Sequence, residues 1–295
     1  MNCKLCGSEK IKIIYKGKIR NGALGRYTNH EVDILQCDDC EVIWHENLFD
    51  DVIQYYESKE YRNSLEGGSE EERFYQLHDK ETLNKLQYTG TDLFRHRIIA
   101  DIGCGCGAFL DFLKGVAKII VAVEPSEAYR EILQKKGFST YAYTKDAKIE
   151  YEGKIEVITS FDVIEHVEEP KDFIHDIYAM LSRGGKAIIG TPTDAPVMRR
   201  LLGKIYEKEL LFSTQHLWIF SEKNLKMITE NIGFSKVQTR YFQRYGIGNM
   251  MGWIKDKIPG NTVEEEFITQ TLDGVWRNQC SEQKMADYIV LYLEK

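Results

Sequence analysis

Short apolar runs alternate with amphipathic segments from Arg97 to the end of the chain. Apolar runs of about four to eight residues between turn residues predict buried strands, and apolar residues three and four positions apart predict helices. The predicted strands are Ile98–Ile102, Lys118–Val123, Ser139–Tyr143, Glu156–Ser160, Lys186–Gly190, Ser235–Phe242 and Asp287–Glu294. The predicted helices are Ala108–Lys114, Ser126–Lys136, Pro170–Ser182 and Glu222–Asn231. This alternation predicts an α/β fold with a parallel sheet and helices on both faces.

The pattern changes along the chain and suggests three regions. Residues 1–48 are rich in cysteine, lysine and β-forming residues, and residues 49–96 combine helical patterning with many charges and aromatic side chains. We therefore expect a small N-terminal module, a helical linker or lid, and a main domain over residues 97–295. Within the main domain, residues 243–286 are too many for a plain connection and predict a helical insertion.

Two Cys-x-x-Cys pairs, thirty residues apart, stand in the first region. Each pair can place two thiolates on one ion, and zinc prefers four such ligands in a tetrahedron. Segments Ile11–Tyr15 and Val32–Gln36 between the pairs read as strands, so the region predicts a zinc ribbon with a closed, structural site. A redox pair or a chance arrangement is the alternative. The predicted metal ligands are Cys3, Cys6, Cys37 and Cys40.

Composition and charge narrow the class of protein. The chain has 295 residues, 43% of them hydrophobic and 29% charged, which is typical of a globular protein. No apolar run reaches the roughly 18 residues of a membrane helix, and no signal peptide follows Met1, so we expect a cytoplasmic protein with reduced cysteines. The net charge of −7 argues against a large nucleic-acid footprint.

A glycine turn after the first main-domain strand carries candidate binding residues. Asp101 stands just before the turn, Gly103, Gly105 and Gly107 stand at alternate positions within it, and a helix follows. Glycines suit a turn that approaches a ligand closely, and the helix N-terminus offers backbone donors. Glu124 ends the next strand, twenty-one residues after Gly103, where a carboxylate can accept both ribose hydroxyls of an adenosine ligand.

These residues resemble the first motif and the acidic residue of class I S-adenosylmethionine-dependent methyltransferases. The dinucleotide-binding motif G-x-G-x-x-G is the alternative, with Ala108 at its third glycine position. A second block, from Phe161-Asp162 through His166 to Pro170, resembles the segment after the fourth strand of small-molecule methyltransferases. The resemblance implies a cofactor site made of Asp101, Gly103, Cys104, Gly105, Glu124, Pro125, Phe161 and Asp162.

Two histidines are candidate catalytic bases. By the same resemblance His166 lies near the transferred methyl group, and the segment from His216 to Ser221 is similar to one beside the substrate opening. A neutral imidazole suits removal of a proton from a hydroxyl acceptor. The alternatives are a structural role for His166 at the start of a helix and a loop-ordering role for His216.

The zinc ribbon followed by a tyrosine-bearing segment resembles bacterial methyltransferases, some of which modify sugars. This resemblance implies O-methylation of a sugar, a nucleotide-linked sugar or a similar small molecule. One of Tyr55, Tyr56 and Tyr61 could then cover the cofactor, and the alternative is aromatic packing between the ribbon and the main domain. The 243–286 insertion would cover the acceptor or form a homodimer contact. The first rival is a zinc-ribbon RNA methyltransferase and the second is a non-catalytic S-adenosylmethionine-binding protein. The RNA rival rests on Lys10, Lys12, Lys16, Lys18, Arg20 and Arg26.

Overall fold

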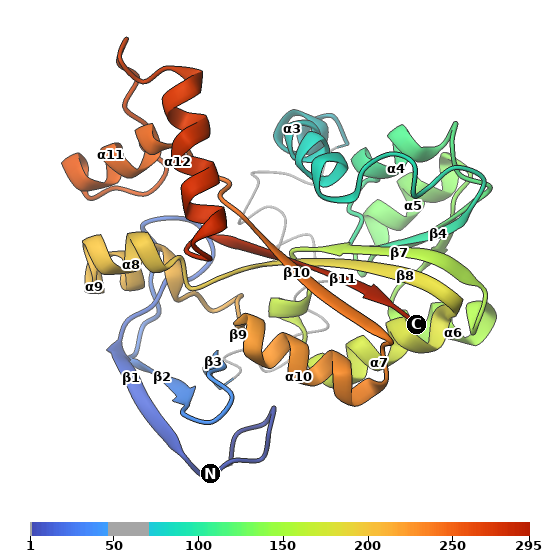
Figure 1. Cartoon of the computed structure of the whole chain (residues 1–295), viewed down its shortest axis with the longest axis horizontal. Coiled ribbons are helices and arrows are strands. Elements are labelled where there is room, and N and C mark those ends of the chain that lie inside the picture. The colour runs from blue at the N-terminus through green and yellow to red at the C-terminus, as the bar shows by residue number, and fades with distance from the viewer. Residues whose placement is uncertain (1, 47–70) are drawn as a thin grey trace. The chain divides into compact units, whose positions relative to one another are not determined.

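The computed structural model describes residues 2–46 and 71–295, which form an α/β fold with a seven-stranded sheet flanked by helices (Figure 1). The predicted fold class is confirmed. In spatial order the strands are β10 (Lys236–Phe242), β11 (Tyr288–Glu294), β8 (Leu181–Pro192), β7 (Ile155–Phe161), β4 (Ile98–Ile102), β5 (Ile119–Val123) and β6 (Ser139–Tyr141). The ladders from β8 through β7, β4 and β5 to β6 are parallel.

The helices between these strands follow the predicted pattern, with one addition. They are α3 (Glu71–Thr89), α4 (Ala108–Leu113), α5 (Glu127–Lys135), α6 (Thr144–Tyr151), α7 (Pro170–Met180) and α10 (Glu222–Ile232). Helix α6 was not predicted, because it is short and polar and its buried residues are Thr144 and Ala147 alone. Pro170 begins α7, where a missing N–H leaves no hydrogen bond unmade.

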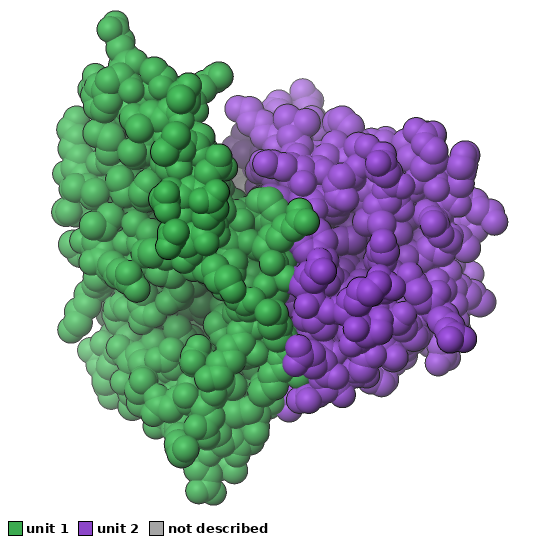
Figure 2. Space-filling model, viewed as in Figure 1, with its two compact units in different colours: residues 1–48, 191–227, 239–290 green, residues 49–190, 228–238, 291–295 purple. Residues whose placement is uncertain are grey.

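The chain divides into two compact units, which Figure 2 colours separately. The first unit contains residues 1–48, 191–227 and 239–290, and the second contains residues 49–190, 228–238 and 291–295. Among the described residues, no helix combines the length and the hydropathy needed to span a lipid bilayer. The three tyrosines Tyr55, Tyr56 and Tyr61 lie outside the described residues.

The N-terminal module is a four-stranded sheet that includes a strand from far along the chain. Its order is β1 (Ile11–Gly17), β2 (Val32–Cys37), β3 (Ile43–Trp44) and β9 (Trp218–Ile219), and each neighbouring pair is antiparallel. The ribbon strands predicted from the sequence are therefore present. Strand β9 was not predicted, because a two-residue strand leaves no periodic pattern to detect.

One hydrophobic core joins the N-terminal module to residues 195–253 within the first unit. Ile19, Val32 and Ile34 from the module pack in this core with Phe212 and Trp253. The remaining elements that supply it or lie beside it are α8 (Pro196–Leu202), α9 (Lys204–Tyr206), the π-helical turn η2 (Glu207–Leu211), α11 (Ile247–Asp256) and α12 (Gln270–Glu282). The last two helices fall within residues 243–286.

The start of α10 is fixed by side chains from three parts of the first unit. The Asn224 backbone N–H donates to the Ser221 hydroxyl at 3.5 Å, which agrees with Ser221 as the predicted N-cap. The carboxylate of Glu222 accepts hydrogen bonds from the ammonium groups of Lys226 and Lys284 at 2.7 and 2.6 Å. Burial alone raises the pKa of Glu222, but these lysines and the Thr239 hydroxyl outweigh it and lower the pKa to about 2.

We predict that Glu222→Gln lowers the free energy of unfolding by about 1–2 kcal/mol at pH 7. A carboxylate with a depressed pKa stabilises the fold above its unfolded-state pKa, near 4.3, and this contribution is lost as the pH falls toward 2. Urea unfolding should therefore show that the difference in free energy of unfolding between the wild type and the variant is smaller at about pH 4 than at pH 7. Glu230→Gln on the same helix is the control, since Glu230 is exposed and forms no ion pair within the described chain. An equal gap at both pH values would contradict the prediction.

Candidate active site and metal centre

The carboxyl ends of β4, β5 and β7 surround a cavity of 370 Å³ in the second unit. The strand order reverses between β4 and β7, because β5 and β6 follow on one side of β4 and β8 follows on the other. In open α/β sheets ligands bind at this switch point, beyond the carboxyl ends of the strands. Five of the residues predicted from the sequence line the cavity: Gly103, Glu124, Pro125, Asp162 and His166.

The glycine turn after β4 has no room for side chains at two positions. Gly103 has φ +74°, and a Cβ there would lie 2.3 Å from Cγ2 of Val163. Gly105 has φ +57°, and a Cβ there would lie 2.4 Å from the ring of Phe74 on α3. Both the backbone conformation and the close neighbours therefore require glycine.

Helix α3 holds the glycine turn in place through the carbonyl of Cys106. The Lys136 ammonium donates to this carbonyl at 3.0 Å, and the Tyr75 hydroxyl on α3 donates to it at 3.3 Å. Burial lowers the pKa of Lys136. This clamp was not found by sequence reasoning, because its residues come from three separate segments that only the fold brings together.

Glu124 presents an ordered carboxylate at the end of β5. Its Oε2 accepts a hydrogen bond from the Gly105 N–H at 2.9 Å, and its Oε1 accepts one from the Ser126 N–H at 3.0 Å. The side chain is buried and also lines the cavity. Each carboxylate oxygen can accept a further hydrogen bond, so Glu124 can receive hydroxyl donors from a ligand.

Asp101 is a buried carboxylate with one unsatisfied oxygen. The Thr159 hydroxyl donates to Oδ1 at 2.6 Å, whereas Oδ2 has no hydrogen-bond partner in the described part of the chain. Burial raises the pKa of Asp101, and the ammonium of Lys85 on α3 counteracts this. An unsatisfied buried carboxylate oxygen is costly, and a cationic or N–H-bearing ligand group would satisfy it. Asp101 itself is not among the residues that line the cavity.

Cys104, Gly105 and Phe161 also lie outside the cavity lining. Burial raises the pKa of the Cys104 thiol well above its usual value, so the group stays protonated. In the described residues Cys104 joins no cluster of potential metal ligands. The ring of Phe161 packs edge-on against Phe109, with centroids 6.4 Å apart. The sequence analysis expected all three in the cofactor site, whereas the structure places none of them in the lining of this cavity.

Asp162 and His166 follow β7 in a constrained turn. Asp162 has φ +57°, and its N–H donates to the Gly190 carbonyl at 3.0 Å. Few residues other than glycine adopt this conformation, and aspartate is among those that do. His166 ends the 3₁₀ turn η1 (Ile164–His166), where its Nε2 lies 3.9 Å from Oε1 of the buried Glu165. This carboxylate can orient the imidazole that borders the cavity.

The other predicted base, His216, belongs to the first unit. The backbone N–H of His216 donates to the Ser213 hydroxyl at 3.2 Å. The Nε2 atom of His45 lies 3.0 Å from the Ser213 carbonyl oxygen and 3.1 Å from that of His216. His45, which the sequence analysis missed, therefore ties the segment with His216 to the N-terminal module. Its sequence distance from that segment left no pattern to detect.

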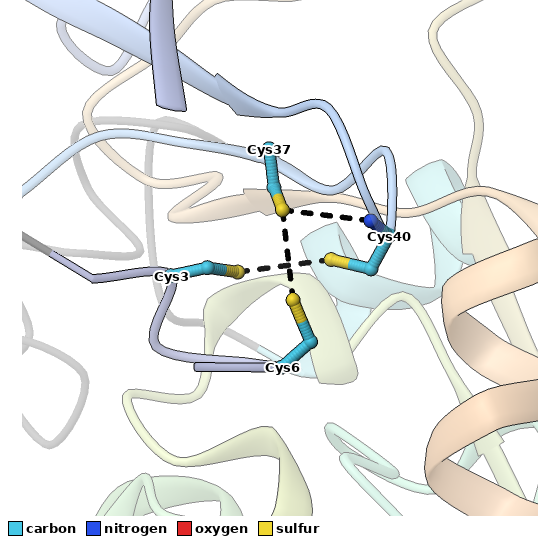
Figure 3. A group of neighbouring side chains, drawn as sticks. All are labelled: Cys3, Cys6, Cys37 and Cys40. Atoms are coloured by element: carbon cyan, nitrogen blue, oxygen red, sulfur yellow. Dashed lines mark hydrogen bonds between the residues drawn. The ribbon is translucent and has the colours of Figure 1, made fainter. Parts of the chain in front are cut away.

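The four predicted metal ligands converge at one point in the N-terminal module (Figure 3). Their Sγ atoms all lie within 4.8 Å of one another. Cys3 Sγ is 3.7 Å from Cys40 Sγ, and Cys6 Sγ is 3.5 Å from Cys37 Sγ. Four Zn–S bonds of about 2.3 Å in a tetrahedron separate the sulfurs by about 3.8 Å, so these distances fit a zinc ion.

The cysteine cluster also holds a thiol with an unusually low pKa. Burial by itself raises the pKa of Cys37, but the backbone N–H groups of Cys40 and Asp39 and the neighbouring thiols offset it. The pKa of Cys37 falls to about 7. A set of four soft sulfur donors is typical of a closed structural site rather than a catalytic one.

Residues 70–239 match the family model described as a methyltransferase domain. This span contains the main-sheet strands from β4 to β8, the glycine turn and both predicted histidines. It also includes the whole of α3.

The chain is similar in sequence to one curated protein and in fold to several solved structures. It is 24% identical over 214 residues to the mitochondrial ubiquinone biosynthesis O-methyltransferase of Schizosaccharomyces pombe. The match covers 66% of this chain and 68% of the relative. Its fold is similar to that of a SAM-dependent methyltransferase from Archaeoglobus fulgidus, with 16% identity, a TM-score of 0.50, and coverage of 75% of this chain and 94% of the other. It is also similar to a chain from a complex between the Haloferax volcanii Trm112 methyltransferase activator and a methyltransferase, with 10% identity, a TM-score of 0.52, and coverage of 84% and 98%.

Proposed function

This chain belongs to the methyltransferase-domain family, and from that premise we propose that this S-adenosylmethionine-dependent methyltransferase methylates a hydroxyl group of a small molecule. The proposed acceptor is a sugar, a nucleotide-linked sugar or a similar metabolite. The Schizosaccharomyces pombe relative is named an O-methyltransferase, which supports oxygen as the acceptor atom. The sugar class rests on the resemblance of the ribbon and the segment after it to bacterial sugar methyltransferases.

Two buried carboxylates are the observation that carries the cofactor assignment. S-adenosylmethionine supplies a methyl carbon that its sulfonium already activates, so the protein has to align the reactants and exclude water. Glu124, fixed by two backbone N–H groups, would accept the ribose hydroxyls. Asp101, with its unsatisfied Oδ2, would accept the ammonium of the methionine part.

A histidine base completes the proposed chemistry. A hydroxyl acceptor must lose its proton before or during attack, and a neutral imidazole can take it. His166 borders the cavity and has the buried carboxylate of Glu165 beside its ring. His216 is the second candidate, on the segment that His45 holds.

The charges of the ribbon support a small-molecule acceptor over RNA. Three of the lysines that favoured the RNA alternative lie beside carboxylates of the same module: Lys10 with Asp39, Lys12 with Asp38, and Lys16 with Asp33. The Nζ–O distances are 3.2, 2.7 and 3.5 Å. Arg20 is buried and donates to the Gly22 carbonyl. Binding of RNA phosphates depends on positive charge that the protein itself does not neutralise, and these ion pairs reduce that charge.

We further propose that the four cysteines hold one structural zinc ion. The short sulfur–sulfur distances support this, as does the small size of the module. Thiolate ligands require a reducing compartment, which agrees with a cytoplasmic location.

The acceptor class can be tested with labelled S-adenosylmethionine and two separate pools, one of nucleotide sugars with cell-glycan extract and one of total RNA. We expect label in the first pool and none in RNA. Label in RNA alone would replace the sugar proposal with the RNA alternative. If neither pool became labelled, both classes of acceptor would be excluded.

In the labelled pool, His166→Ala or His216→Ala should lower turnover by about 10²- to 10⁴-fold if that histidine is the base. His175→Ala is the control, because His175 is an exposed residue of α7. Turnover near the wild-type value in the double variant would exclude a histidine base.

Asp101→Asn and Glu124→Gln should each weaken binding of S-adenosylhomocysteine by about 10- to 100-fold, since each loses a charge-assisted hydrogen bond. Isothermal titration calorimetry measures this effect without an acceptor. Glu131→Gln is the matched control, because Glu131 is exposed on α5. Wild-type affinity in both site variants would contradict the assignment.

Purified protein should contain about one zinc ion per chain, and Cys37→Ser should lose it together with part of its thermal stability. Elemental analysis and a melting curve provide the two measurements. Cys280→Ala is the control, because Cys280 lies on α12 outside the cluster. Equal zinc content in the wild type and Cys37→Ser would reject the metal site.

A further inference from the structure

A second cavity, of 130 Å³, lies wholly within the first unit. It forms where α8, α11 and α12 lie together (Figure 1). None of its lining residues borders the 370 Å³ cavity of the second unit. The side chains that shape it include Met198, Tyr206, Asn249, Met250, Trp253 and Trp276.

Two polar groups in the wall of this cavity lack partners. Tyr206 is 7% exposed and Trp253 is 2% exposed. Within the described chain, neither the Tyr206 hydroxyl nor the Trp253 indole N–H makes a hydrogen bond. Burial raises the pKa of Tyr206, so its hydroxyl remains protonated and able to donate.

Three other polar side chains of the wall, Trp276, Gln243 and Asp287, make hydrogen bonds within the first unit. The indole N–H of Trp276 donates to the Tyr245 carbonyl at 3.2 Å. The carboxylate of Asp287 accepts hydrogen bonds from the Arg244 N–H at 2.8 Å and from the Gln243 amide at 3.3 Å. Because most buried polar groups in proteins are satisfied, the two unpaired donors point to a ligand that offers acceptors.

The size and lining of the cavity indicate the kind of ligand. An engineered cavity of about 150 Å³ holds one benzene molecule, so this cavity suits a single six-membered ring. The rings of Tyr206 and Trp253 lie with centroids 5.4 Å apart, and Met198 and Met250 add soft apolar surface. Asp287, the charged side chain of the wall, is already bound to Gln243 and Arg244. The lining therefore favours an uncharged ring with an apolar face.

We propose that this cavity binds an uncharged, hydroxylated six-membered ring, whose oxygens accept hydrogen bonds from the Tyr206 hydroxyl and the Trp253 indole N–H. A pyranose and a phenol share this chemistry. Binding here requires neither S-adenosylmethionine nor methyl transfer, so the proposal stands or falls separately from the proposed function.

Saturation-transfer NMR on the full chain, without cofactor, tests the proposal at millimolar ligand concentration. One arm uses methyl glucopyranoside, galactopyranoside and mannopyranoside, and the other uses catechol. We expect saturation transfer in one arm, which identifies the ring as a sugar or a phenol. Absence of transfer in both arms would overturn the proposal.

Two variants locate the bound ring. Tyr206→Phe removes an unpaired hydroxyl and should fold normally. We expect it to raise the Kd for the ring about three- to tenfold. Met250→Trp should fill the cavity and abolish binding. Tyr178→Phe, on α7 in the second unit, is the matched control and should bind as the wild type does. An unchanged Kd in Tyr206→Phe would overturn the proposal even if Met250→Trp failed to fold.

Discussion

The burial of ribbon side chains against residues far along the chain organises the first unit. A module of fewer than fifty residues cannot bury enough apolar surface to fold alone. Ile19, Ile34 and Ile43 are almost completely buried, in a core that Phe212 and Trp253 complete. Each such side chain contributes about 1.5–3 kcal/mol when removed from water. The shared core therefore supplies apolar burial that the module lacks by itself.

The shared core gives the ribbon a scaffolding role. Strand β9 extends the ribbon sheet, and His45 contacts two carbonyl oxygens of the segment that carries His216. The position of that histidine thus depends on a module that contributes no residue to the lining of the 370 Å³ cavity. The N-terminal module thus has a structural role within the first unit, and the two lysines of β1, Lys12 and Lys16, are paired with carboxylates of the same module.

The second unit depends on a different constraint, which is the close approach of two elements to the glycine turn. Val163 and Phe74 occupy the space that side chains at Gly103 and Gly105 would need. In the resulting turn the Gly105 N–H donates to Glu124, which fixes the carboxylate at the edge of the 370 Å³ cavity. Packing, backbone conformation and the proposed ligand contact therefore all require the same glycines.

The amino-acid sequence was enough to predict the α/β class, strand β4 to the residue and most other main-sheet strands to within a few residues. It also predicted the convergence of four cysteines. These features are local, because apolar period, turn residues and ligand spacing are written in consecutive positions. Only the tertiary structure decided that α3 covers the glycine turn, that His45 holds the His216 segment, and that Tyr206 and Trp253 meet around a cavity. Such contacts join residues that are distant in the chain, and packing rather than periodicity selects them.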